Sequence, residues 1–135
     1  MTSGSGGRET ILLAEDDKAL RFLVARILRS AGYTVIEAVD GEDALACSAR
    51  HGHIDLLVTD MVMPKLGGVE LARRLCASDA GMRVMYMSGY PDAGLGKRSE
   101  FESDASWVAK PFAASDLLKE VRNRLDTPRA ALERT

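Results

Sequence analysis

Side chains that can bind a cation or a phosphoryl group stand at the ends of four short apolar segments of this 135-residue chain. An acidic run occupies 15–17, Asp60 ends a second segment, and Ser88 and Lys110 end two more. If these segments are parallel strands, their carboxyl ends gather the carboxylates at one edge of a sheet. Carboxylates that lie so close together repel one another unless a cation binds between them. A hard divalent cation with few protein ligands and several waters, such as magnesium, fits this set.

Motifs of several other chemistries are missing from the sequence. It has neither a G-x-x-x-x-G-K-[ST] phosphate loop nor a G-x-G-x-x-G after its first apolar segment, which argues against nucleotide binding. It also lacks a Ser-His-Asp nucleophile elbow. Cys47 and Cys76 form no C-x-x-C pair and are expected to pack as small hydrophobic residues. His51 and His53 precede the third apolar segment, at the opposite edge of the sheet, and are expected to be ordinary loop residues.

Two alternating patterns predict the elements that position these groups. Three of the five apolar segments are near-continuously apolar, as in parallel strands that are buried on both faces. The predicted strands are 10–14, 33–38, 54–59, 83–88 and 105–109. Stretches with helical periodicity lie between them. Strands that alternate with helices predict a single-domain α/β fold, a doubly wound (βα)5 sandwich with a five-stranded parallel sheet and helices on both faces.

The predicted helix over 17–31 carries the clearest local signals. Asp17 is predicted as its N-cap, and Gly32 stands where a helix C-terminal glycine belongs. A helix over 91–100 is predicted to be weak because it contains two glycines, and Ser115 is predicted to cap the last helix. The apolar stripe of the first helix consists of Leu20, Val24, Ile27, Leu28 and Ala31.

Composition limits the partners and the number of domains. Hydrophobic residues at 46% and charged residues at 28% are typical of one globular domain. A net charge of -2 without a basic block argues against nucleic-acid binding, and no apolar run approaches the length of a membrane span. The unpaired cysteines indicate the reducing cytoplasm. We expect a flexible Gly/Ser-rich segment at 1–9, a folded domain at 10–126 that is a monomer or weak dimer, and a polar tail at 127–135.

Four segments together resemble the signatures of the response regulator receiver domain, the CheY-like family. They are Leu12–Asp17, Thr59–Pro64, Met87–Tyr90 and Lys110–Phe112. Each motif alone is weak, but all four occur in the family's order and spacing. The second and third segments are most similar to receivers of hybrid sensor histidine kinases. The resemblance implies a flavodoxin-like sheet with strand order 2-1-3-4-5.

The same resemblance implies a phosphoacceptor in a two-component phosphorelay, not an enzyme with a separate substrate. Asp60 would accept a phosphoryl group from a phosphohistidine partner. Glu15, Asp16, Asp60 and the backbone carbonyl of Val62 would hold Mg²⁺, and Lys110 would supply a second positive charge.

Two further roles are implied for the other strand ends. Ser88 would donate its hydroxyl to the phosphoryl group and act with Trp107 as a switch pair. The peptide between Lys110 and Pro111 would be cis, and the helix over 91–100 would be the mobile element.

The implied partner is a sensor histidine kinase or a histidine phosphotransfer protein, with no contact to nucleic acid or membrane. Phe22 is predicted to lie opposite the apolar stripe of the first helix, beside Ala25, Arg26 and Arg29. We expect a docking patch that receives two partner helices on an aromatic anchor with a polar rim. Its predicted members are Ala19, Phe22, Leu23, Arg26, Pro111 and Phe112.

Two alternatives stay open at this point. A small phosphohydrolase of the haloacid-dehalogenase type uses similar groups, but its nucleophile ends the first strand in a D-x-D pattern, where this chain has Glu15-Asp16-Asp17. The second alternative is a receiver that docks partners without being phosphorylated. Side chains suited to phosphorylation nevertheless stand at all five positions that the family uses. With acetyl phosphate and magnesium, a stable adduct, turnover or no change would distinguish the three.

Overall fold

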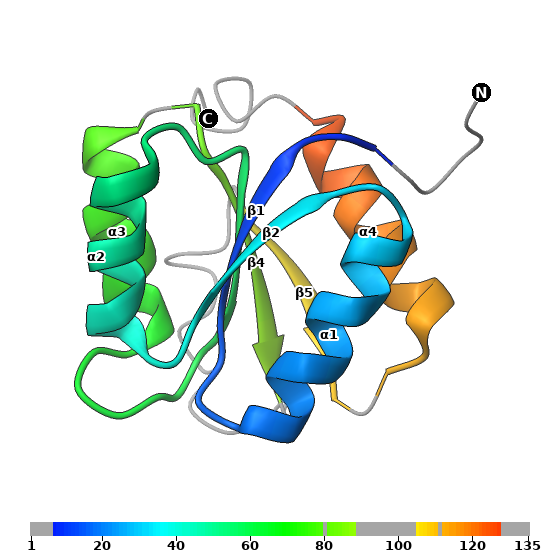
Figure 1. Cartoon of the computed structure of the whole chain (residues 1–135), viewed down its shortest axis with the longest axis horizontal. Coiled ribbons are helices and arrows are strands. Elements are labelled where there is room, and N and C mark those ends of the chain that lie inside the picture. The colour runs from blue at the N-terminus through cyan, green and yellow to red at the C-terminus, as the bar shows by residue number, and fades with distance from the viewer. Residues whose placement is uncertain (1–6, 80, 89–104, 111, 128–135) are drawn as a thin grey trace.

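The structure is a computed structural model that describes residues 7–79, 81–88, 105–110 and 112–127. Strands and helices alternate along these residues from the first strand to the fourth, and a fifth strand and a last helix follow (Figure 1). The helix predicted over 91–100 lies outside them. The elements are β1 (Thr10–Ala14), α1 (Lys18–Ser30), β2 (Thr34–Ala38), α2 (Gly41–His51), β3 (Leu56–Asp60), α3 (Gly68–Ser78), β4 (Arg83–Ser88), β5 (Ala105–Ala109) and α4 (Ala114–Leu125).

The strands form one parallel sheet in the order β2-β1-β3-β4-β5, which confirms the predicted fold class and strand order. Figure 1 shows α2 and α3 on one face of this sheet and α1 and α4 on the other. The carboxyl ends of the strands lie toward the lower edge of the view, where β1 turns into α1. The acidic run at 15–17, Asp60, Ser88 and Lys110 all lie at these ends or directly after them.

Burial on both faces explains the continuous apolar strands. Ile11 and Leu13 of β1 belong to the core beneath α1 and α4, whereas Leu12 and Ala14 belong to the core beneath α2 and α3. All four are completely buried. Because successive side chains of a strand point to opposite faces, a strand covered on both sides needs apolar residues at every position.

The ends of α1 are fixed by the residues that the sequence predicted. The Asp17 side chain accepts a hydrogen bond from the Leu20 N–H at 3.1 Å, as an N-cap does. Gly32 has a φ of 102°, a left-handed conformation that favours glycine. The Tyr33 N–H then reaches back to the Leu28 carbonyl at 3.3 Å, which closes a Schellman-type turn. Both terminal predictions are confirmed.

Two local predictions were wrong. Helix α4 begins at Ala114 with Ala113 as its N-cap, so Ser115 lies inside the first turn and does not cap it. Ala25 was placed on the exposed side of α1 but is buried. Helix α1 packs against α4 as well as the sheet, so its buried arc is wider than the apolar stripe.

No helix in the described part of the chain has both the length and the apolar character that crossing a bilayer requires.

Candidate functional site

Three carboxylates meet at the carboxyl edge of the sheet. Glu15 and Asp16 follow β1, and Asp60 is the last residue of the neighbouring strand β3. One side-chain oxygen from each residue lies within 4.8 Å of the other two. Glu15 is buried, Asp60 is partly buried and Asp16 is exposed. The predicted acidic cluster is therefore present, and its ligand atoms are all oxygens, the donors that magnesium prefers.

Lys110 brings an ammonium group into this cluster from the end of β5. Its Nζ lies 3.2 Å from a carboxylate oxygen of Glu15 and 3.2 Å from one of Asp60. Burial by itself lowers the pKa of Lys110, but the two carboxylates outweigh it and the pKa lies above its ordinary value. Lys110 is thus positively charged at neutral pH and joins the two acids.

Glu15 is held by both of its oxygens and by its main chain. One carboxylate oxygen accepts the Asp17 N–H at 2.9 Å and the other accepts Lys110 at 3.2 Å. Arg21 donates to the Glu15 carbonyl at 2.8 Å. Burial raises the pKa of Glu15, the Asp17 amide lowers it, the Asp60 charge raises it again, and the net pKa is above the ordinary value. The sequence analysis missed Arg21 and the Asp17 amide; the only sequence signal was a basic residue one turn into α1.

The loop between β3 and α3 is closed by main-chain hydrogen bonds. The Met61 N–H donates to the Met87 carbonyl at 3.3 Å, and the Gly68 N–H donates to the Met61 carbonyl at 3.0 Å. Val62 lies inside this loop and is 81% exposed. The first residue of α3 is therefore docked directly against the end of β3, beside Asp60. The role of the Val62 carbonyl as a metal ligand stays a prediction.

The backbone places the predicted switch residues on adjacent strands. Ser88 is the last residue of β4 and pairs with Ala109 of β5, while Trp107 of β5 pairs with Tyr86. Ser88 thus shares the sheet edge of the acidic cluster. Pro111 lies outside the described residues, and so does the predicted cis peptide.

Most of the predicted docking residues are accessible on α1. Phe22 is 64% exposed and Leu23 is 50% exposed, and Ala19 and Arg26 are exposed as well. Phe112 is half-buried and packs against the core beneath α1 and α4.

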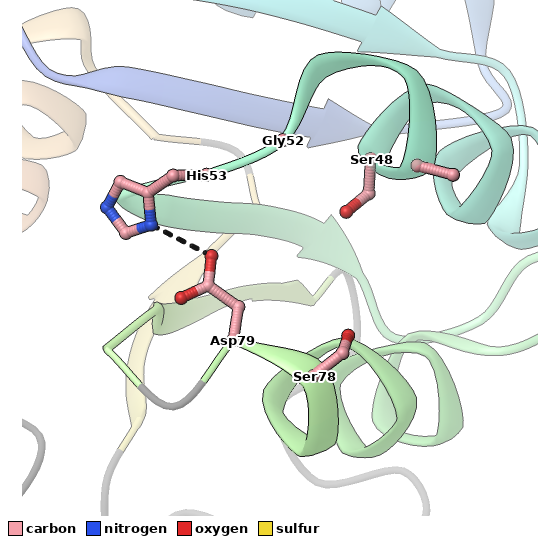
Figure 2. Close-up of a pocket in the computed structure, with 6 residues that line it drawn as sticks. Ser48, Gly52, His53, Ser78 and Asp79 are labelled. Carbon is pink, nitrogen blue, oxygen red and sulfur yellow. Dashed lines mark hydrogen bonds and ion pairs between the residues drawn. The ribbon is translucent and has the colours of Figure 1, made fainter.

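A hollow of about 410 Å³ lies at the opposite edge of the sheet from the acidic cluster. Figure 2 shows His53 turned toward Asp79 across its mouth. The two ring nitrogens of His53 each lie 3.0 Å from a carboxylate oxygen, one of Asp79 and the other of Asp55. His53 lies in the loop between α2 and β3, as predicted, and its ring links the start of β3 to the end of α3. His51, by contrast, is the last residue of α2, so the prediction that it is a loop residue was wrong. The hollow is lined by Ser48, Ala49, Gly52, His53, Ser78 and Asp79.

Comparison with known families identifies this arrangement. The sequence profile described as "Response regulator receiver domain" matches residues 11–122. The chain belongs to the response regulator receiver domain family. Among curated relatives, this receiver is 36% identical over 115 residues to the response regulator receiver protein CpdR of Brucella abortus, covering 85% of this chain and 95% of that protein. It is 33% identical over 121 residues to the sensor kinase CckA of the same organism, covering 89% of this chain but 13% of that kinase.

Solved structures agree with this assignment. The receiver domain of the hybrid histidine kinase CckA is 35% identical, with a TM-score of 0.74, and the match covers 87% of this chain and 99% of that one. A response regulator receiver protein from Sinorhizobium medicae is 30% identical, with a TM-score of 0.80, and the match covers 89% and 96%.

The family assignment makes this chain a receiver domain of a two-component system, with its acidic cluster at the phosphorylation site. It is a signalling phosphoacceptor and not a catalytic enzyme. The haloacid-dehalogenase alternative is accordingly set aside. Receivers interact with histidine kinases or phosphotransfer proteins, which is the class of partner expected here.

Proposed function

We propose that Asp60 is the residue of this receiver that accepts the phosphoryl group, and that Mg²⁺ is the required cation. The observation that carries the proposal is the position of Asp60 at the end of a buried strand, inside the carboxylate cluster and 3.2 Å from the Lys110 ammonium. A nucleophilic carboxylate on a rigid strand, beside a fixed positive charge, is oriented for attack on phosphorus.

The transfer step forms one bond and breaks one. A carboxylate oxygen of Asp60 attacks phosphorus, and the bond between phosphorus and the donor histidine nitrogen breaks, with the electron pair returning to the imidazole. Lys110 already contacts Asp60 and would balance negative charge on the transferred group. Ser88, at the same sheet edge, would donate its hydroxyl to a phosphoryl oxygen, with Trp107 as its switch partner. Glu15, Asp16, Asp60 and the Val62 carbonyl would hold magnesium, which when bound offsets the charge of the carboxylates and the phosphoryl oxygens.

Acetyl phosphate labelling tests the acceptor. Incubation with magnesium and acetyl phosphate, followed by intact-mass measurement, should show one added phosphoryl group on the wild type and none on Asp60→Asn. Asp116→Asn removes an exposed carboxylate from the first turn of α4 and should label like the wild type. Unchanged labelling of Asp60→Asn would refute the assignment, and continuous turnover without an adduct would favour a phosphohydrolase.

We further propose that the partner docks on the exposed face of α1, through Phe22, Leu23, Ala19 and Arg26, together with Phe112 and Pro111. The support is the exposure of an aromatic and an aliphatic side chain at consecutive positions of a helix that begins at the phosphorylation edge. Such anchors, ringed by a polar rim, are typical of helix-binding surfaces.

Two phosphoryl donors, a phosphohistidine protein and acetyl phosphate, distinguish an effect on docking from an effect on the transfer step. Phe22→Ala should slow transfer from a phosphohistidine protein severalfold while leaving acetyl phosphate labelling unchanged. Arg26→Ala should weaken the same transfer, whereas Arg73→Ala, an exposed arginine of α3 on the other face of the sheet, should not. Equal loss with both donors would mean that Phe22 supports folding, and no loss with either would remove it from the interface.

A further inference from the structure

We propose that Gly68 is a positioning residue for Asp60. The missing side chain at position 68 lets the first turn of α3 lie against the main chain of the acceptor, and any larger residue would displace Asp60 from the acidic cluster. This inference rests on the proposed role of Asp60 and of magnesium.

The contact is between main-chain atoms. A Cβ atom built on Gly68 would overlap the carbonyl oxygen of Asp60 and would lie 3.1 Å from the Asp60 carbonyl carbon and 3.2 Å from the Met61 Cα. Gly68 is buried, and its N–H donates to the Met61 carbonyl at 3.0 Å. The glycine is therefore held against the acceptor by a hydrogen bond on one side and by close contact on the other. An added methyl group has no flexible side chain to push aside, so the backbone of β3 or of α3 must move.

Neighbouring glycines differ in what they touch. A Cβ on Gly67 would meet only the Met61 carbonyl oxygen, at 3.3 Å, which is a mild crowding. A Cβ on Gly41, the first residue of α2, would overlap the carbonyl oxygen of Leu66 and lie 2.6 Å from the Leu66 Cβ. Gly41 thus offers a steric conflict as severe as that at Gly68, but against a residue outside the acidic cluster.

Small displacements of Asp60 should have large effects. Magnesium demands near-ideal octahedral geometry, with ligand distances of about 2.0–2.1 Å. Reactive constellations must be held within about 0.5 Å, and a misplacement of about 1 Å can cost a factor of about 100 in rate. We therefore expect Gly68→Ala to raise the dissociation constant for magnesium, and to lower the labelling rate at saturating magnesium, each by about 10-fold or more.

The experiment compares Gly68→Ala with Gly41→Ala and the wild type. Thermal unfolding in EDTA measures the structural cost of each methyl group, calorimetric titration with MgCl₂ measures magnesium affinity, and intact mass measures labelling by acetyl phosphate. Both variants should lose thermal stability, because both introduce a steric overlap. Only Gly68→Ala should lose magnesium affinity and labelling, while Gly41→Ala stays within about threefold of the wild type. If Gly68→Ala is unfolded in buffer, all three proteins are measured in the same concentration of trimethylamine oxide, which favours the folded state.

The other outcomes would overturn either the positioning role of Gly68 or the proposed function. Equal losses of magnesium affinity in the two variants, or wild-type affinity and labelling in Gly68→Ala, would overturn the positioning role. A Gly68→Ala protein that stays unfolded in the osmolyte would make the glycine a folding requirement and overturn it too. Failure of the wild type to bind magnesium or to be labelled would instead overturn the proposed function.

Discussion

Replacing Lys110 with methionine should destabilise the metal-free receiver, because it removes the ammonium that joins Glu15 to Asp60. Methionine has an apolar side chain of similar length and lacks the ammonium group with its charge and hydrogen-bond donors. Glu15 is 1% exposed, and among the described residues its carboxylate would keep the Asp17 N–H as its hydrogen-bond partner. A buried carboxylate that loses its counter-charge is among the most costly defects a point substitution creates.

The magnitude follows from the two 3.2 Å contacts. At an effective dielectric constant of about 20, unit charges 3.2 Å apart attract by about 5 kcal/mol, before the cost of desolvation is subtracted. Breaking a buried ion pair by removing one partner costs about 3–5 kcal/mol. Because the Lys110 side chain is 21% exposed and Asp60 is partly hydrated, we expect a loss of about 2–3 kcal/mol in the free energy of unfolding.

Urea unfolding in EDTA, followed by circular dichroism, measures this loss. With an m-value of about 2 kcal/mol/M, the midpoint should fall by about 1 M or more. Glu15→Gln removes the buried charge and retains an oxygen that can accept the Asp17 N–H. In that background Lys110→Met should therefore cost about 1–2 kcal/mol less than in the wild type. A loss under about 0.5 kcal/mol, or the same loss in both backgrounds, would show that this ion pair does not stabilise the apo protein.

Three further outcomes are expected. Burial lowers the pKa of His53, but Asp55 and Asp79 outweigh it, so the pKa is raised. The contacts of protonated His53 with these two carboxylates therefore stabilise the folded protein fully below about pH 6.5, and this stabilisation is lost as the pH rises through the folded-state pKa. Because His53 is well exposed, His53→Gln should cost at most about 1 kcal/mol at pH 6 and less at pH 8.5, and a cost that grows with pH in urea unfolding would contradict this. Gly32→Ala should lose about 1–2 kcal/mol in the same assay, because a residue with a Cβ is strained at a φ of 102°; wild-type stability would mean that the turn relaxes. Magnesium at ten times its dissociation constant should add about 1.4 kcal/mol to the wild type, a rise of roughly 3–6 °C in Tm, and much less to Asp60→Asn; equal rises in the two proteins would place the bound ion elsewhere.

Local patterns in the sequence were sufficient for the fold class and for the composition of the site. Strands buried on both faces are apolar at every position, so β1 and β3 could be found from short segments alone. The Asp17 cap and the Gly32 turn depend on interactions between residues at most five positions apart, which a linear sequence displays directly. The alternation of strands and helices then placed Glu15, Asp16 and Asp60 at one edge of a sheet, because parallel strands share the direction of their carboxyl ends.

Contacts between distant segments were decided only by the tertiary structure. Lys110 reaches Glu15 across 95 positions of the chain, and no spacing rule states that one ammonium serves two carboxylates. The same holds for His53 with Asp79, for the burial of Ala25 in the core that α1 shares with α4, and for Gly68 against the carbonyl of Asp60. Periodicity specifies which face of an element is buried, whereas the packing of whole elements fixes which atoms meet on that face. The sequence therefore determined which groups gather at the site. The packing of α3 against β3, and the position of β5 beside β4, determined how these groups are held.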